Sequence, residues 1–174
     1  MKSYKEHIQH GDSSFPFDLF HQHFPTVGMQ CCRIHWHDES EWIYVYQGCI
    51  SVFIDAVEYI VQENCLLCIP PKVLHYIICR EDVRYITCIF RLEMLDFKQN
   101  DSSERDYITP ILEQQIWFTM PIAFHDDKVK HCYFEIDEDF QEAYTGYELA
   151  IKANLYKIIA YANRIHAFVE HNKL

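Results

Sequence analysis

Short apolar runs follow one another from about residue 25 to residue 92. They are rich in Ile, Val, Tyr and Phe, which favour β-strands, and turn residues such as Gln47-Gly48 and Pro70-Pro71 separate them. The expected strands are Gly28–His37, Glu41–Tyr46, Ile50–Ile54, Glu58–Val61, Cys65–Ile69, Leu74–Ile78 and Tyr85–Leu92. Evenly spaced short strands predict a mainly β chain that forms a closed barrel or a sandwich.

After His131 the apolar residues change from strand to helix periodicity. Tyr133–Ala143 predicts a short acidic helix, and a second helix is expected from Thr145 to about His171. The second helix carries two apolar stripes about 200° apart. One stripe consists of Leu149, Ala153, Tyr156 and Ala160, and the other of Ile151, Leu155, Ile158, Ala162, Ile165 and Val169.

The two stripes need two packing partners. One is expected to pack on the barrel, and the heptad spacing of the longer stripe, which begins at Ile151, favours a homodimer through an antiparallel helix pair. A helix wedged between two parts of one domain is the alternative. We therefore expect residues 1–130 to form a barrel with an N-terminal arm, and residues 131–174 to form a helical dimerisation segment packed on it.

Charge and composition argue against some classes of function. The 174 residues include 26 Asp and Glu against 15 Lys and Arg, a net charge of −11, which argues against this chain holding nucleic acid by itself. The N-terminal sequence lacks the apolar region of a signal peptide, and the apolar runs are too short to cross a membrane, so we expect a cytoplasmic protein without a membrane partner. The eight cysteines are expected to be free, buried thiols.

Three histidines and one glutamate are candidate ligands of a metal ion. His35 and His37 are two residues apart in an expected strand and therefore project from one face. Glu41 can re-enter on that face from the next strand, and His75 can approach from across the barrel. Imidazole and carboxylate groups suit Zn, Ni, Mn or Fe(II). Two alternatives stay open: a polar lining that contacts an organic effector, and side chains that only hydrogen-bond one another.

Strand alternation extends this candidate site into a pocket. Four apolar side chains are expected to face inward with the histidines: Ile43, Val45, Cys88 and Phe90. An apolar wall with a few polar groups suits a sugar, an aromatic or another small organic ligand. A second pair with the same spacing, His21 and His23, is expected to lie on an exposed strand rather than to bind metal.

Two motifs carry a family resemblance. The spacing HxHx3Ex6G, formed by His35, His37, Glu41 and Gly48, resembles the first motif of the cupin family, and CLLCIPPKVLH resembles the second. HWHDESEWIYVYQG and IPPKVLH, with the sequence GYEL leading an apolar helix, are more narrowly similar to the N-terminal sensing domain of AraC-type transcription regulators. The similarity extends over about residues 15–170. It implies a cupin double-stranded β-helix (a jelly-roll barrel) that binds a small effector, followed by two helices that dimerise.

The resemblance has further implications. In AraC-type regulators a C-terminal pair of helix-turn-helix units binds DNA, and this chain stops at Leu174, where such a domain would begin. DNA binding is therefore expected only through a domain absent from this chain. Phe15 and Phe17 are candidates, by the same resemblance, for an arm that closes over the effector; packing on one barrel face is the alternative. The chain departs from the cupin pattern at Asn64 and Lys72, where Gly is usual.

Two classes of function follow. The first, which we favour, is a ligand-sensing, dimerising module that shifts a conformational equilibrium, with no catalytic residue and no required cofactor. Its effector pocket would comprise Phe15, Phe17, His35, His37, Glu41, Ile43, Val45, His75, Cys88 and Phe90. The second is a metal-dependent cupin enzyme, such as a dioxygenase or an isomerase, in which the four candidate ligands leave coordination positions open for substrate or O2.

Overall fold

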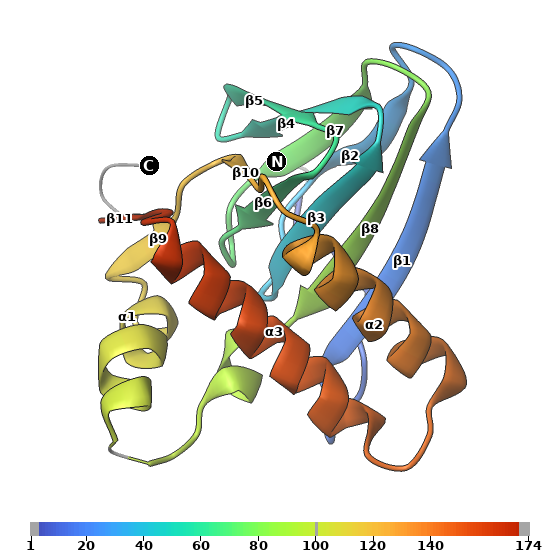
Figure 1. The fold of residues 1–174 in the computed structure, drawn as a ribbon. Coiled ribbons are helices and arrows are strands. Elements are labelled where there is room, and N and C mark those ends of the chain that lie inside the picture. The colour runs from blue at the N-terminus through green and yellow to red at the C-terminus, as the bar shows by residue number, and fades with distance from the viewer. Residues whose placement is uncertain (1–3, 100, 171–174) are drawn as a thin grey trace.

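Two antiparallel sheets face one another in the computed structural model, which describes residues 4–99 and 101–170 (Figure 1). The larger sheet has the strand order β1-β8-β3-β6-β10, and the smaller has the order β2-β7-β4-β5. The strands of the larger sheet are β1 (Phe17–Phe24), β3 (Ser40–Gln47), β6 (Cys65–Ile69), β8 (Val83–Phe90) and β10 (Ile122–Ala123). Those of the smaller sheet are β2 (Gln30–His35), β4 (Cys49–Ile54), β5 (Val57–Gln62) and β7 (His75–Cys79).

The architecture is a mainly β jelly roll, as expected. All seven expected strands are present, with bounds within two residues of the expected ones. The strand β1 was not expected as a barrel strand, but its His21 and His23 are exposed and contact Asp137 and Asp82, which confirms that this pair lies on an exposed strand. The eight cysteines are free; six are buried, and Cys31 and Cys32 are half-buried.

The hydrophobic core has two parts, one on each face of the larger sheet. Inside the barrel, Ile43 and Val45 of β3 pack with apolar residues of the smaller sheet. On the outer face, Trp42 and Tyr44 pack beneath helices; the Tyr44 ring stacks on Tyr133, with ring centroids 5.0 Å apart. Because the centre of this sheet is covered on both faces, its strands β3 and β8 are buried at most positions.

Helices and a small third sheet cover the outer face of the larger sheet. The helices are α1 (Thr109–Leu112), α2 (Lys128–Glu142) and α3 (Tyr147–Arg164), with a 3-10 turn at Leu92–Leu95 and a π-helical turn at Glu104–Ile108. The third sheet pairs β9 (Ile116–Phe118) with β11 (Phe168–Glu170). Figure 1 shows α2 and α3 lying side by side across the larger sheet. The C-terminal part of the chain is therefore helical but returns to a strand.

The second helix is shorter than expected. It ends at Arg164, whereas the expected end near His171 lies outside the described residues. The chain turns because His166 adopts a left-handed conformation (φ 55°), and the Ala167 N–H donates to the Ala162 carbonyl, which closes the helix end. The helix begins at Tyr147, two residues after the expected start at Thr145, and its N-cap is Gly146, without a side-chain cap.

The assignment of the two helix stripes was wrong. Ile151, Leu155, Ile158 and Ala162 are buried in the core beneath α3, so they are not free to form a dimer face. The last two residues of that stripe, Ile165 and Val169, lie beyond the helix. The other stripe is more exposed: Leu149 is 74% exposed and Ala153 and Ala160 are exposed, whereas Tyr156 is half-buried against the core.

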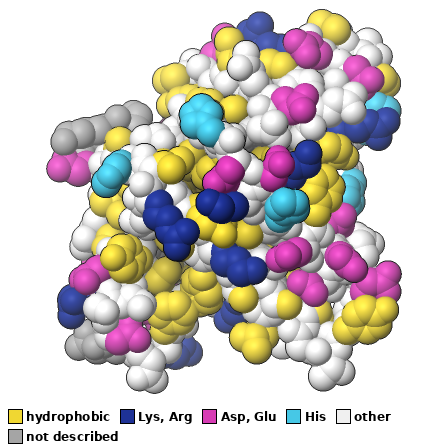
Figure 2. Space-filling view, viewed as in Figure 1, with side chains coloured by type: hydrophobic (Ala, Val, Ile, Leu, Met, Phe, Trp, Pro, Cys, Tyr) yellow, Lys and Arg dark blue, Asp and Glu magenta, His cyan; other side chains and the backbone are white. Residues whose placement is uncertain are grey.

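Surface features agree with an acidic, globular chain. Figure 2 shows acidic side chains gathered over α2, where the run from Asp126 to Glu142 lies mainly at the surface. Among the described residues, none of the helices is both long and apolar enough to cross a membrane. Gly48 closes the β3–β4 turn with φ 78°, and a Cβ at this position would clash with the Asp82 carbonyl oxygen.

Candidate metal centre

Four candidate ligands meet at one end of the barrel, as the sequence predicted. His35 ends β2 and pairs directly with His75, which begins β7. His37 lies in the connection that follows β2, and Glu41 is the second residue of β3. One ligand atom from each of the four residues lies within 4.8 Å of the others. The sheets thus bring together residues that are up to 40 positions apart in the sequence.

Each imidazole is oriented by a backbone carbonyl. The Nδ1–H of His35 donates to Arg33 O at 2.8 Å, that of His37 to Glu39 O at 3.1 Å, and that of His75 to Val73 O at 2.9 Å. These bonds leave the three Nε2 atoms as the inward-facing groups. Such outer hydrogen bonds fix the tautomer and the ring orientation of histidines that bind metal ions.

The contacts at the centre of the cluster are favourable only if a cation or a proton is present. Glu41 Oε2 lies 3.3 Å from His37 Nε2 and 3.0 Å from His75 Nε2. An Nε2 lone pair and a carboxylate oxygen are both acceptors, so a metal ion, or a proton on the imidazole, must lie between them to make the contact favourable. Glu41 is 5% exposed and His75 is 1% exposed, so their contact is shielded from bulk water.

The pKa shifts describe the same electrostatics. Burial would raise the pKa of Glu41, but hydrogen bonds from His37 and His75, and their charges, hold it well below its ordinary value. Burial works to lower the pKa of His37, yet the hydrogen bond and charge of Glu41 raise it overall. Burial and then the neighbouring His75 lower the pKa of His35. The cluster therefore holds a carboxylate and at least one imidazole that favours the neutral form.

The donor set fits a divalent transition metal. Three imidazole nitrogens and one carboxylate oxygen are ligands that Zn, Mn, Fe(II) and Ni accept, and the three backbone carbonyls supply the outer hydrogen bonds such a site needs. His35, His37, Glu41 and His75 would hold the ion. When bound, it would polarise a ligand or substrate oxygen placed beside the cluster.

A polar pocket of about 540 Å³ adjoins the cluster and was not predicted from the sequence. His37, Glu39 and Arg91 form its inner side. Asp38 also lines it, and the N-terminal segment contributes Lys5, Glu6, His7, Ile8, Gln9, His10, Asp12, Ser13 and Pro16. The one signal in the sequence was the density of Glu, His and Lys in residues 5–10, which no strand or helix pattern placed near the histidines.

Part of the predicted effector pocket lies elsewhere. Cys88 and Phe90 face the helices on the outer side of the larger sheet, so the prediction that they face inward was wrong. The residues of β8 that face inward are shifted by one position. Facing the barrel interior from β8 are Tyr85 and Thr87, directly opposite Val45 and Ile43. Ile43 and Val45 do point inward, but into a packed apolar interior.

Phe15 and Phe17 also lie on the outer side of the larger sheet. The Phe17 ring stacks on Phe90, with centroids 6.1 Å apart, and both phenylalanines belong to the core beneath the helices. The alternative stated for them, packing on one barrel face, is what the structure shows.

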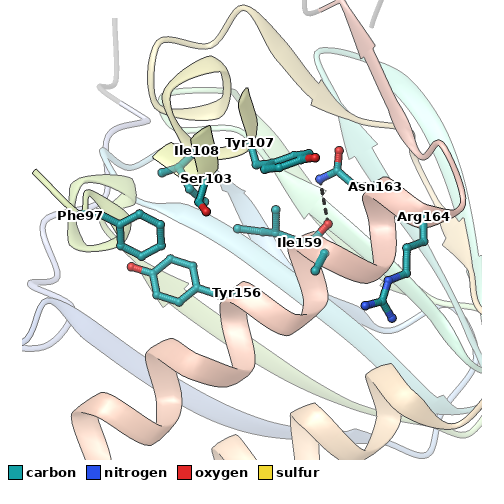
Figure 3. A pocket seen from close by; sticks show the side chains of 9 residues that line it. Phe97, Ser103, Tyr107, Ile108, Tyr156, Ile159, Asn163 and Arg164 are labelled. Carbon is teal, nitrogen blue, oxygen red and sulfur yellow. Dashed lines mark hydrogen bonds between the residues drawn. The ribbon is translucent and has the colours of Figure 1, made fainter. Parts of the chain in front are cut away.

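A second hollow, about 340 Å³, lies between α3 and the side chains of Phe97, Ser103, Tyr107 and Ile108 (Figure 3). Its walls are largely apolar: the Phe97 and Tyr156 rings lie 4.6 Å apart, and Ile159 forms part of the floor. The Tyr156 hydroxyl donates to Leu95 O, which fixes the ring. No predicted effector residue lines this hollow.

Comparison with known proteins gives the class of this fold. Residues 28–90 match the family described as Cupin domain, and the two facing sheets with their converging histidines are a cupin fold. No curated protein matches this chain.

Solved cupin structures resemble the chain at low identity. An RmlC-like cupin from Shewanella frigidimarina is 23% identical, over 42% of this chain and 65% of that one, with a TM-score of 0.39. A mutant of Bacillus subtilis oxalate decarboxylase is 24% identical, over 52% of this chain and 24% of that one, with a TM-score of 0.40. KdgF from Halomonas sp. is 18% identical, over 42% and 67%, with a TM-score of 0.39. This chain thus spans less than two thirds of each of the first two structures.

Proposed function

We propose that this cupin domain is a ligand-sensing module of the AraC type. In this proposal the histidine cluster holds a divalent metal ion, and a small polar effector occupies the adjoining 540 Å³ pocket. The pocket carries charged and hydrogen-bonding groups, which favours a hydroxyl-rich, sugar-like effector over an aromatic one. DNA would be bound through a separate C-terminal domain, as the resemblance of the motifs implies.

One observation carries the proposal: a single segment touches both the cluster and the C-terminal helices. At one end, Glu6 and His10 lie beside the histidine cluster. At the other end, the Phe15 ring contacts Tyr147, the first residue of α3, with centroids 5.7 Å apart. A change of occupancy at the cluster therefore has a packed route to the helices, which a sensor needs and an isolated binding site does not.

Zinc binding is expected to slow amide hydrogen exchange around residues 140–150. The reason is that an ion at the cluster would favour one position of the N-terminal segment. The contact of Phe15 with Tyr147 would then stabilise the start of α3 in the same state. Phe15→Leu removes this ring contact and should abolish the effect on the helices without changing zinc affinity more than about twofold. Phe53→Leu, which removes a stacked ring from Tyr76 on the smaller sheet, is the matched control. Equal helix protection in Phe15→Leu and the unaltered domain would contradict the sensor.

We also propose that the domain forms a homodimer through the exposed stripe of α3. Leu149, Ala153, Tyr156 and Ala160 recur at intervals of 4, 3 and 4 residues, the spacing of a helix-pair seam. Tyr107, which is 49% exposed, continues this apolar surface beside the hollow of Figure 3.

Leu149→Glu is expected to convert the dimer to a folded monomer, because it places a charge in the proposed seam. Sedimentation velocity measures the change directly. Gln141→Glu adds the same acid at an exposed position of α2 away from the stripe and should leave the dimer intact. If the unaltered domain sediments as a monomer, the proposed dimer is wrong.

A metal-dependent enzyme is the second candidate. The observation that favours it is the ligand set itself, since three histidines and one glutamate leave coordination positions open for a substrate beside the polar pocket. Steady turnover of a small organic acid or sugar by the metal-loaded domain, with no zinc effect on the helices, would favour the enzyme over the sensor.

A further inference from the structure

A second carboxylate, Glu6, lies beside the histidine cluster and comes from the N-terminal segment. The Glu6 N–H donates to Trp36 O at 2.9 Å, and the Trp36 N–H donates to Tyr4 O at 3.0 Å. These two backbone bonds dock the segment along the residue that separates His35 from His37. The Glu6 carboxylate then points to the cluster, with its Oε2 3.7 Å from His35 Nε2.

The Glu6 carboxylate is held by a buried histidine. His10 Nε2 lies 3.3 Å from the same Oε2 atom of Glu6, and the His10 ring edge faces the His37 ring, with centroids 5.7 Å apart. His10 is 5% exposed, and its Nδ1 is buried without a hydrogen-bond partner, 3.6 Å from Asp18 Oδ2. Burying an imidazole in this way costs free energy, which orienting a carboxylate toward a cation would offset.

The separation of Glu6 and His35 suits two ligands of one ion. Nitrogen and oxygen ligands lie about 2.0–2.2 Å from zinc, so two ligands of the same ion are at most about 4.4 Å apart. The 3.7 Å between Glu6 Oε2 and His35 Nε2 is within this limit. Glu6 is not one of the four residues whose ligand atoms all lie within 4.8 Å of one another, so ligation requires its side chain to move toward the ion. Lys5 adds a second tether for the segment, because its Nζ lies 2.7 Å from Asp38 Oδ2.

We propose that Glu6 is an additional metal ligand, positioned by His10, so that the ion ties the N-terminal segment to the barrel. This inference rests on the proposed metal binding and deepens it: the segment becomes part of the metal centre rather than a neighbour of it. Metal binding at the cluster then favours the docked state of residues 4–10, because the ion has one more ligand in that state. Docking of the segment in turn strengthens metal binding.

Replacing Glu6 with glutamine tests this role. Glu6→Gln keeps the size of the side chain but removes its charge, and it should weaken zinc binding by about 10- to 100-fold in a competition titration with a chromophoric chelator. Zinc should also no longer slow hydrogen exchange of residues 4–10. Glu6→Asp, which keeps a carboxylate on a shorter arm, should recover part of the affinity. Glu63→Gln, at an exposed glutamate of the β5–β6 turn, is the matched control.

The outcomes separate the two proposals. Zinc affinity of Glu6→Gln within twofold of the unaltered domain, with protection of residues 4–10 retained, overturns the role of Glu6 and leaves the metal centre standing. Absence of zinc binding by the unaltered domain overturns both. Weaker binding together with lost protection of residues 4–10, in Glu6→Gln but not in Glu63→Gln, supports Glu6 as a ligand.

Discussion

Replacing both His35 and His37 with alanine is expected to weaken zinc binding by at least about 100-fold while the barrel stays folded. Loss of a single outer-sphere partner of a metal ligand already costs about 10- to 100-fold, and this variant loses two ligands. Glu41 would keep one imidazole, since His75 Nε2 lies 3.0 Å from its carboxylate. A competition titration gives the affinity, and far-ultraviolet circular dichroism reports the barrel.

The chain provides a matched control for this variant. His21 and His23 have the same spacing on β1, but their imidazoles contact Asp137 and Asp82 at the surface. Alanine at both of these positions removes the same groups and should leave zinc affinity unchanged. Equal affinity in the two double variants would place the metal outside the cluster.

Leu155→Glu is expected to unfold the domain. Leu155 is fully buried between α3 and the larger sheet, and a carboxylate there loses its hydration without gaining a partner. The substitution should lower the free energy of unfolding by roughly 5 kcal/mol, comparable with the whole stability of many domains. Urea unfolding followed by tryptophan fluorescence measures this change.

The same substitution six residues earlier should have little effect on stability. Leu149 is 74% exposed, so Leu149→Glu is expected to change the free energy of unfolding by less than about 0.5 kcal/mol in the monomer. Equal urea midpoints for Leu155→Glu and Leu149→Glu would show that the stripe with Leu155 does not pack on the barrel.

Much of the fold could be predicted because the local signals agree with the final structure. The strands from residue 28 to residue 92 alternate with clear turn residues, and the position of each strand follows from them. The four candidate ligands could be predicted as a group because His35 and His37 share a face and His75 begins the strand that pairs with β2.

The sequence pattern could not show which residues of β8 point into the barrel. Every residue from Tyr85 to Phe90 is buried, because the larger sheet packs on the smaller sheet on one side and on helices on the other. A strand that is apolar on both faces carries no signal for which residues point inward. The inward assignment of Cys88 and Phe90 failed for this reason.

The helix stripes and the N-terminal segment escaped prediction for related reasons. Both stripes of α3 are apolar, and only the packed structure shows that Leu155 is buried and Leu149 is exposed. The N-terminal segment docks through backbone bonds between Tyr4, Glu6 and Trp36, and backbone bonds leave no pattern in side-chain chemistry. The position of Glu6 and His10 beside the cluster therefore could not be predicted from the sequence.

X-ray absorption at the zinc edge, on the domain loaded with one equivalent of Zn²⁺, tests the metal centre most directly. The histidine cluster requires a first shell of nitrogen and oxygen at about 2.0–2.2 Å, together with the outer-shell scattering of imidazole rings. The eight free cysteines make the opposite result equally clear. A zinc–sulfur distance of about 2.3 Å would place the ion on thiols instead and would contradict a centre built from His35, His37, Glu41 and His75.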